Sequence, residues 1–255
     1  MPEAYERHLV PALFRPFAAD LAARAAALRP ATVLELAAGT GALTSALLTA
    51  VPTASVVASD LNEAMVAAGS AREPRATWRQ ADAQRLPFED GSFDLVVCQF
   101  GVMFFPDRPA AYGEVRRVLA PQGRFLFNSW GPLAAHGFGA AFQDALEQAM
   151  PGAAPAFLRE VPHGYTDRAQ VASDIAAAGL DLAAVEDVTL DGLGESAASV
   201  ATGFLTGTPV SAALEAHPDA PAVTSAVVRS MTQSLGPGAV TAAMTATVYT
   251  AHPRA

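Results

Sequence analysis

The chain has 255 residues, of which 51% are hydrophobic and only 16% charged, which excludes global disorder and provides enough apolar material for a core. Its 16 basic and 25 acidic residues give a net charge of −9, so we do not expect a nucleic-acid partner. Every basic residue is an arginine and the one cysteine is Cys98, which excludes lysine chemistry, an intrachain disulfide and a four-thiolate zinc site; we expect no metal.

The sequence carries no targeting or membrane signal that we can recognise. The first residues lack a basic head followed by an apolar stretch, and no apolar run approaches the roughly 18 residues of a membrane span. We therefore expect a cytoplasmic protein with no membrane partner. It would act as a monomer or a homodimer.

Residues 5–28 predict amphipathic helix, because leucines and Phe17 recur at helical spacing between charged positions. Pro11 and Pro16 are expected to break this stretch into short helices.

From residue 30 to residue 130, short apolar runs alternate with helical patterns. The predicted strands are 32–36, 55–59, 76–80, 93–98 and 124–128, and the predicted helices are 43–48, 62–71 and 110–119, with a turn at 121–123. Strands that are almost continuously apolar and separated by helices indicate a parallel sheet covered on both faces.

After residue 130 the pattern loosens. We predict helices at 138–150, 168–178, 196–205, 211–216 and 222–235, and strands at 185–190 and 244–250. The helical stretch 191–240 is too long for a hairpin loop, so it is interpreted as an insertion between the last two strands.

The most informative segment runs from Val33 to Thr44, where a buried strand leads through a turn containing Gly39 and Gly41 into a helix. Glycine permits left-handed torsions and a close approach of ligand to backbone. The following helix directs its free N–H groups at the turn, which lies at the carboxyl end of a parallel strand, where open α/β sheets bind their ligands. The alternative is a tight connection without a ligand.

Two aspartates follow the next two strands. Asp60, at the end of the second strand, can accept hydrogen bonds from both hydroxyls of a ribose. Its alternative role is to cap the helix that begins near Asn62. Asp82, just after the third strand, can accept from the exocyclic amine of adenine, or it is an ordinary turn aspartate.

Together these elements resemble a class I S-adenosylmethionine-dependent methyltransferase of the methyltransferase type 11-like subgroup. The matching motifs are Glu35 with Gly39-Thr40-Gly41, Asp82-Ala-Gln-Arg-Leu-Pro-Phe88, Phe93-Asp-Leu-Val96 and the stretch 114–124, within a similarity that covers about residues 30–131. The resemblance implies a Rossmann-like, doubly wound, mostly parallel seven-stranded sheet with helices on both faces and a helical cap. The implied organisation is a single domain with entrance helices (1–30), a cofactor-binding core (31–130), a cap segment and return helix (131–182), and the last two strands with their insertion (183–255).

The resemblance also implies which residues hold S-adenosylmethionine, and its product S-adenosylhomocysteine. Glu35 and the backbone of the turn would hold the methionine end of the cofactor. Asp60 would bind the ribose and Asp82 the adenine. The two phenylalanines after the fourth strand would line the chamber in which the methyl group is transferred. The cofactor-binding positions are Glu35, Ala37, Gly39, Gly41, Asp60, Leu61, Met65, Asp82, Ala83, Gln99, Phe100 and Phe104. Ala37 departs from the family, which commonly has glycine there, and its methyl group is expected to narrow the turn slightly.

The predicted activity is in-line methyl transfer to a small-molecule acceptor, for which the protein mainly positions the reactants and excludes water. The candidate acceptor-binding residues are Trp130, His136, His163 and Tyr165, with His136 as a possible general base. The acceptor and the choice among O-, N- and C-methylation stay open, as does the need for a base.

Two other functions stay open. The turn Gly39-Thr40-Gly41 resembles that of an NAD(P)-dependent oxidoreductase, although Thr44 stands where the third glycine of that motif would be. The chain could also bind the cofactor without turning it over.

Overall fold

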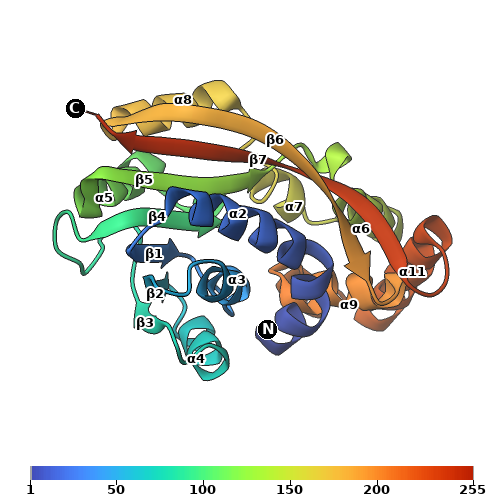
Figure 1. Cartoon of the computed structure of the whole chain (residues 1–255). Helices are drawn as coiled ribbons and strands as arrows, with labels where there is room; N and C mark the ends of the chain where they lie inside the picture. The colour runs from blue at the N-terminus through green and yellow to red at the C-terminus, as the bar shows by residue number, and fades with distance from the viewer. Residues whose placement is uncertain (1, 255) are drawn as a thin grey trace. The chain divides into compact units, whose positions relative to one another are not determined.

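The computed structural model describes residues 2–254, and within them seven strands form one sheet in the order β3-β2-β1-β4-β5-β7-β6 (Figure 1). The strands are β1 (Thr32–Leu36), β2 (Ser55–Asp60), β3 (Thr77–Gln80), β4 (Phe93–Gln99), β5 (Leu119–Trp130), β6 (Leu180–Gly194) and β7 (Val240–Pro253). Strands β1 to β5 pair in parallel, and the order reverses at β1, since β2 and β3 lie on one side of it and β4 on the other. The predicted Rossmann-like, mostly parallel seven-stranded sheet is confirmed.

The predicted helices are present in the predicted order with small shifts at their ends. They are α1 (Pro2–Ala4), η1 (Tyr5–Phe14), α2 (Arg15–Leu28), α3 (Ala42–Ala50), α4 (Glu63–Arg72), η2 (Val102–Phe104), α5 (Arg108–Val118), η3 (Leu133–Ala135), α6 (Gly137–Ala149), α7 (Phe157–Glu160), α8 (Arg168–Ala177), α9 (Ala197–Gly207), α10 (Val210–Glu215) and α11 (Ala220–Leu235). Four short ones, α1, η2, η3 and α7, were not predicted. The predicted insertion between the last two strands is present as α9, α10 and α11.

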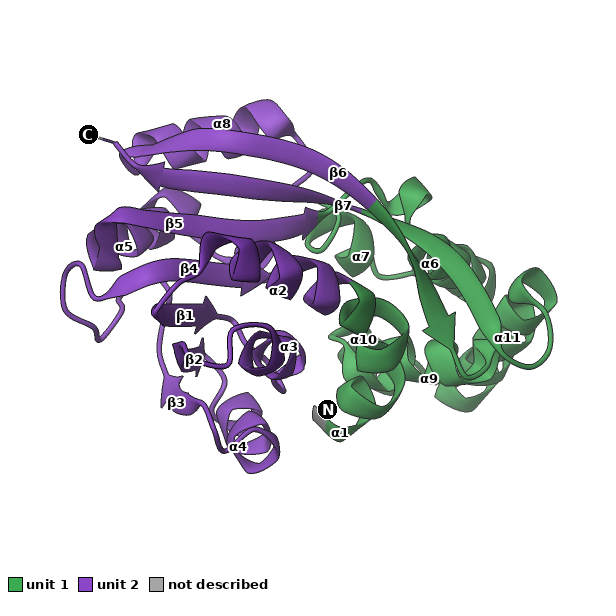
Figure 2. Cartoon of the chain, viewed as in Figure 1, with its two compact units in different colours: residues 1–16, 130–164, 189–245 green, residues 17–129, 165–188, 246–255 purple. Residues whose placement is uncertain are grey.

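Figure 2 shows two compact units, each assembled from three stretches of chain. The sheet unit comprises residues 17–129, 165–188 and 246–255, and the helical unit comprises residues 1–16, 130–164 and 189–245. The residues of β6 and β7 are divided between the two units. The division into four segments of a single domain, made from the sequence, stays a prediction.

The N-terminal helical run corrects one expectation. Pro11 does not break it, because η1 is a π-helix in which the N–H of Arg15 donates to the carbonyl of Val10, five residues back. Pro16 is the second residue of α2, in a first turn where the missing N–H of proline does little harm.

Three strands are longer than predicted. β5 begins at Leu119 and includes the expected turn 121–123, because a register shift opposite Phe93 absorbs these residues as a bulge. β6 and β7 extend well beyond the predicted 185–190 and 244–250. The three buried residues of β6 are Leu180, Gly192 and Gly194, at its ends, and two of them are glycines, so the strand carries no apolar alternation there that a sequence pattern could detect.

The core of the sheet unit holds the carboxyl end of β1 in place. Leu21 of α2, Val33 of β1, Leu43 and Leu47 of α3 and Val97 of β4 belong to one buried apolar cluster, and each is at most 1% exposed. Removing side chains of this size from water is worth about 1.5–3 kcal/mol each. The turn that follows β1 therefore begins and ends on fixed elements.

Candidate functional site

Glu35 lies near the carboxyl end of β1, paired in register with Ala58 of β2 and Val97 of β4. Its side chain is buried, and the Thr44 hydroxyl donates to its Oε2 at 2.6 Å. Burial raises the pKa of Glu35 to about 8; the hydrogen bond from Thr44 opposes this rise and the carboxylate of Asp60 adds to it. Glu35 is thus a mostly neutral acid near pH 7, and a bound cation would favour its ionised form.

The turn from β1 to α3 has a left-handed backbone at three residues, with φ of +52° at Ala37, +55° at Gly39 and +92° at Gly41. The N–H of Ala38 donates to the carbonyl of Ser59 at 2.9 Å, which ties the turn to the end of β2. Gly41 is the N-cap residue of α3, so the first N–H groups of that helix are directed at the turn. A ligand at this edge of the sheet meets backbone N–H donors without intervening side chains.

The methyl group of Ala37 was expected to narrow the turn, but it packs against Gly101 instead. A Cβ atom built on Gly101 would lie 2.6 Å from the Cβ of Ala37 and 2.6 Å from the Sγ of Cys98. The methyl group of Ala37 therefore packs against the backbone of Gly101, in space that only a glycine leaves open.

Asp60 braces the turn through both carboxylate oxygens. Its Oδ2 accepts from the N–H of Gly39 at 2.8 Å and its Oδ1 accepts from the N–H of Asn62 at 2.8 Å. The cap of α4 is Asn62, whose side chain accepts from the N–H groups of Ala64 and Met65. A carboxylate has about four lone-pair sites, so Asp60 retains acceptor capacity for ribose hydroxyls.

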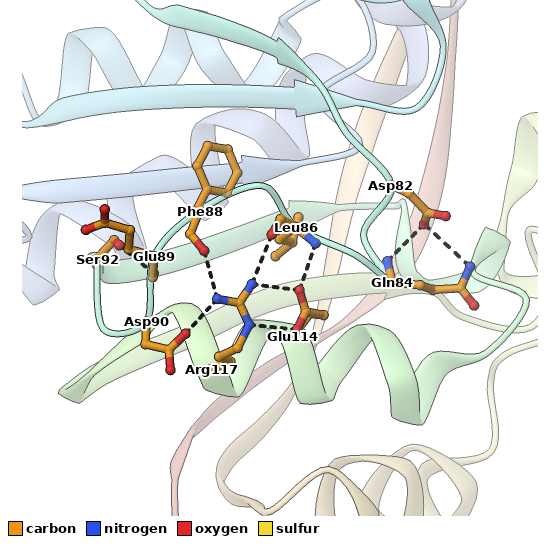
Figure 3. Close-up of polar contacts among 9 residues, drawn as sticks. All are labelled: Asp82, Gln84, Leu86, Phe88, Glu89, Asp90, Ser92, Glu114 and Arg117. Carbon is orange, nitrogen blue, oxygen red and sulfur yellow. Dashed lines mark hydrogen bonds and ion pairs between the residues drawn. The ribbon is translucent and has the colours of Figure 1, made fainter.

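Asp82 is exposed and forms a local turn, as Figure 3 shows. Its Oδ1 accepts from the backbone N–H of Gln84 at 2.9 Å and from the side-chain amide of Gln84 at 3.4 Å. The other oxygen makes no bond to the residues drawn and points away from Gln84 in the same view. The neighbouring Ala83 is half-buried. Asp82 is therefore a turn aspartate with one oxygen available to a ligand.

The loop after Asp82 is held by a bidentate ion pair (Figure 3). Arg117 donates to Glu114 through two bonds of 2.7 Å, and to the carbonyls of Leu86 at 3.0 Å and Phe88 at 2.7 Å. Glu114 accepts from the N–H of Leu86 at 2.8 Å, and Asp90 pairs with Arg117 at 2.8 Å. These bonds lower the pKa of Glu114 and raise that of Arg117.

The carboxyl end of β4 turns sharply at Phe100, which has a φ of +51°. Its N–H donates to Oδ1 of Asn128, the residue paired with Gln99 in the sheet. The ring of Phe100 is buried and packs edge-on against Phe17, with ring centroids 5.3 Å apart. Phe104, at the end of η2, has half of its side chain exposed, so it is the more open of the two rings predicted to line the transfer chamber.

These residues fit S-adenosylmethionine. Leu61 and Phe104 are 66% and 50% exposed, although the described chain exposes only two other large hydrophobic side chains. Met65, on the first turn of α4, is half-buried. The buried Nδ2 of Asn128 has no hydrogen-bond partner within residues 2–254. Exposed apolar side chains and one buried amide nitrogen without a partner in the described chain, at the strand ends that also carry Asp60, suit a nucleoside ligand.

The helical unit contains an aromatic cluster of Trp130, His136 and His163. The His136 ring lies 4.6 Å from that of Trp130 and 5.2 Å from that of His163, centroid to centroid. Nδ1 of His136 accepts from the N–H of Gly139 at 2.9 Å, which caps α6, and burial lowers the pKa of His136 to about 3. The Nδ1 lone pair of His136 is occupied and the lowered pKa makes the ring a weak base, which argues against the predicted role of His136 as the general base.

His163 differs from His136 in its hydrogen bond. Its Nδ1 lies 2.7 Å from the carbonyl oxygen of Gly131, so this nitrogen carries the proton and Nε2 keeps its lone pair. Burial lowers the pKa of His163. His163 and Trp130 stay candidates for contact with an acceptor.

Tyr165 belongs to the sheet unit and is only 3% exposed. Its hydroxyl donates to Asp174 at 2.8 Å and lies 3.4 Å from the hydroxyl of Tyr112. The side chain is thus already engaged inside the unit, which argues against the predicted contact with substrate.

The described residues contain neither a metal-binding cluster nor a membrane-spanning helix. No group of three or more His, Cys, Asp or Glu side chains there is arranged to hold a metal ion. No helix of the described chain has the length and apolar character needed to cross a membrane.

A doubly wound parallel sheet, a glycine turn after β1 and acidic side chains after β2 and β3 are typical of nucleoside-cofactor enzymes. The sequence model of a family described as "Methyltransferase domain" matches residues 34–127, which contain every predicted cofactor residue. The demethylmenaquinone methyltransferase of Thermus thermophilus is 38% identical over 138 residues, which cover 52% of this chain and 61% of that protein. That of Mycolicibacterium vanbaalenii is 36% identical over 157 residues, which cover 58% of this chain and 67% of that protein.

Among solved structures, the YcgJ protein of Bacillus subtilis superposes with a TM-score of 0.59 at 20% identity, over 94% of this chain and 99% of that one. The chain belongs to the class I S-adenosylmethionine-dependent methyltransferase family. It spans about three fifths of the length of the first curated relatives that it matches.

Several residues that shape the site were missed by sequence reasoning. Thr44 is the partner of Glu35, Gly101 makes room for Ala37, and Gln84 orients Asp82. Asn62 could have been identified, because an asparagine followed by glutamate before an apolar run is an N-cap signal. The other contacts join distant or irregular segments and leave no periodic signal.

Proposed function

We propose that this chain transfers a methyl group from S-adenosylmethionine to a small-molecule acceptor. The observation that carries the proposal is the double bracing of Asp60 by the N–H groups of Gly39 and Asn62, at the strand ends of a chain whose residues 34–127 match the methyltransferase family. This arrangement fixes an acidic side chain beside a glycine turn before any ligand binds, which reduces the entropy lost on binding.

The side chains divide the binding of the cofactor among them. Asp60 accepts from the ribose hydroxyls, Oδ2 of Asp82 accepts from the adenine amine, and the backbone N–H of Ala83 donates to the adenine ring. Leu61 and Met65 cover the sugar and base. Glu35 and the backbone carbonyl of Gln99 favour the positive methionine amine, and the turn from Ala37 to Gly41 forms the floor.

When bound, the cofactor supplies a sulfonium-activated methyl group, so the protein needs only to align an acceptor and exclude water. Phe104, half-exposed at the end of η2, shields the reacting centre, and its ring face favours the positive sulfur. Trp130 and His163 contact the acceptor. No general base is assigned, because burial lowers the pKa of His136 to about 3 and its Nδ1 lone pair already accepts from the N–H of Gly139.

Binding of the cofactor can be tested by titration calorimetry with S-adenosylhomocysteine. Asp60→Ala removes both braces and the ribose contact, so we expect its affinity to fall more than about tenfold, or about 1.4 kcal/mol. A matched control is Asp94→Ala: Asp94 also accepts backbone N–H groups, from Ala31 and Thr32 at 2.9 and 3.0 Å, but at the amino end of β1. The control should keep the wild-type affinity within about twofold. Equal losses in both variants would contradict the ribose assignment.

Turnover is tested separately with a labelled methyl donor. Incorporation of label into small molecules of a metabolite extract, and none into added nucleic acid, is expected. Tight binding of the donor without incorporation in any extract would favour a non-catalytic binding protein, and binding of NADH in its place would favour an oxidoreductase. A cytoplasmic location and a monomeric or dimeric state are proposed as well; sedimentation measures the latter.

A further inference from the structure

A polar cluster next to η2 takes no part in the chemistry proposed above. It consists of the half-buried Arg108 and the buried Tyr165 and Asp174, all within the sheet unit, and Tyr165 and Asp174 are 3% and 7% exposed. Buried polar side chains are normally retained only when their partners are fully defined. The contacts of these three side chains therefore indicate which part of the backbone they hold in place.

Arg108 donates two hydrogen bonds to η2, the turn that carries Phe104. Its Nε donates to the carbonyl of Val102 at 3.2 Å, and its Nη2 donates to the carbonyl of Met103 at 2.9 Å. The planar guanidinium thus contacts two consecutive carbonyls immediately before Phe104. Bonds from a charged donor are stronger than bonds between neutral groups.

Tyr165 fixes the guanidinium from the other side. The central guanidinium carbon of Arg108 lies 4.1 Å from the centroid of the Tyr165 ring, a cation–π contact. The ring cannot turn freely, because its hydroxyl donates to Asp174 at 2.8 Å and Asp174 also accepts from Gln170 at 2.6 Å. Helix α8, which carries Gln170 and Asp174, is thus connected through Tyr165 and Arg108 to η2.

The residue before Arg108 makes a second connection. The N–H of Asp107 donates to Oε1 of Gln84 at 3.1 Å, and the backbone N–H of Gln84 donates to Oδ1 of Asp82. The amino end of α5 therefore contacts both the turn before Phe104 and the loop that presents Asp82. It thereby holds two separate parts of the proposed cofactor site, η2 and the loop after β3.

We infer that Arg108 is a positioning residue of the methyltransferase site, which with Tyr165 holds η2 where Phe104 shields the reacting centre. This inference rests on the proposed function for its role. Arg108 touches neither cofactor nor acceptor; it acts through the carbonyls of Val102 and Met103. Tyr165, predicted from the sequence as a substrate contact, contributes through the guanidinium that it supports.

Hydrogen–deuterium exchange of the intact chain, with and without S-adenosylhomocysteine, tests the inference. In Arg108→Met, peptides covering residues 99–107 should exchange about tenfold faster, because the turn loses its two side-chain bonds, whereas peptides covering β1 and β2 should be unchanged. Arg108→Lys, which keeps the charge and one donor to the carbonyls, should restore part of the protection. Tyr165→Leu should reproduce the faster exchange, and Tyr165→Phe should give an intermediate value.

The matched control is Arg116→Met. Arg116 lies on the same helix and also donates to a backbone carbonyl, that of Gly179 at 3.1 Å, on a different part of the sheet unit. It should leave the exchange of residues 99–107 unchanged. Unaltered exchange there in Arg108→Met, or an equal rise along the whole chain, would overturn the inference. Failure of the wild type to bind S-adenosylhomocysteine, with the local effect of Arg108→Met intact, would instead count against the proposed function.

Discussion

Ala37 illustrates how one methyl group is tolerated in a conformation that suits glycine. Its φ of +52° places an L-residue in the left-handed region, which costs roughly 1–2 kcal/mol. The methyl group lies over Gly101, where a second Cβ would be only 2.6 Å away. The left-handed turn and the glycine after β4 are therefore coupled, although 64 positions separate them in the chain.

We predict that Gly101→Ala destabilises the chain by about 1–3 kcal/mol, since the new methyl group collides with Ala37 and with the Sγ of Cys98. In an Ala37→Gly background the first collision is absent and only the second persists. The loss should therefore be smaller there by at least about 0.5 kcal/mol. Urea unfolding of the four proteins in this double-mutant cycle measures the coupling. Strictly additive effects would show that the two residues do not share the space.

At the level of elements, the loop between β3 and β4 depends on a single arginine of α5. Arg117 and Glu114 together make contacts with the backbone of Leu86 and Phe88, as Figure 3 shows. The loop has little apolar burial apart from Leu86, which is 4% exposed, and Phe88, which is half-buried against Phe93. The charged hydrogen bonds are therefore a main restraint on a segment that follows the predicted adenine contact.

We predict that Arg117→Met loosens this loop and lowers the free energy of unfolding by about 1–3 kcal/mol, because two carbonyls and two carboxylates lose a charged partner. Limited proteolysis should cut within residues 84–92 faster than in the wild type. Arg124→Met is the control, since Arg124 donates only to the carbonyls of its neighbours Gln122 and Gly123. If both variants resist protease as well as the wild type does, the ion pair is not what orders the loop.

For the whole molecule, two buried groups with large pKa shifts, Glu35 and His136, contribute to the dependence of stability on pH. Glu35 has a pKa near 8 in the folded chain against 4.5 as a free side chain, so it keeps a proton that the unfolded chain releases. Stability therefore falls as the pH rises from about 4.5 to about 8. His136 has the opposite effect, because folding lowers its pKa from 6.5 to about 3. Its contribution makes stability fall as the pH falls below about 6.5.

Above pH 6.5 the contribution of His136 to the pH dependence fades, because the unfolded imidazole loses its proton, and of these two groups Glu35 then has the larger effect up to pH 8. We predict that wild-type stability falls across this interval by about 2 kcal/mol at most, and that Glu35→Gln removes the fall while retaining an acceptor for Thr44. Urea unfolding at both ends of the interval measures the difference. A wild-type curve that is flat, or a variant curve with the wild-type slope, would contradict the assigned cause.

The parallel sheet, the glycine turn and the acidic ends of β2 and β3 were all readable from the sequence. Each is a local signal: apolar runs between turn residues, glycines between a strand and a helix, a carboxylate directly after a strand. The prolines at positions 11 and 16 were misread, because a π-helix changes the hydrogen-bond spacing without any pattern in the side chains. The lengths of β6 and β7 were underestimated because few apolar residues are buried beyond the predicted ranges, and two of the buried residues at the end of β6 are glycines, Gly192 and Gly194.

Local patterns in the sequence thus predicted which helices and strands form and which family the chain belongs to. They could do so because helix and strand periodicities depend on neighbours a few residues apart. The state of individual site groups depended on the folded chain. Burial changed Glu35 into a mostly neutral acid and His136 into a cap, and placed Tyr165 under Arg108, 57 positions away. Dielectric surroundings and contacts between remote segments exist only after folding, so no local pattern encodes them.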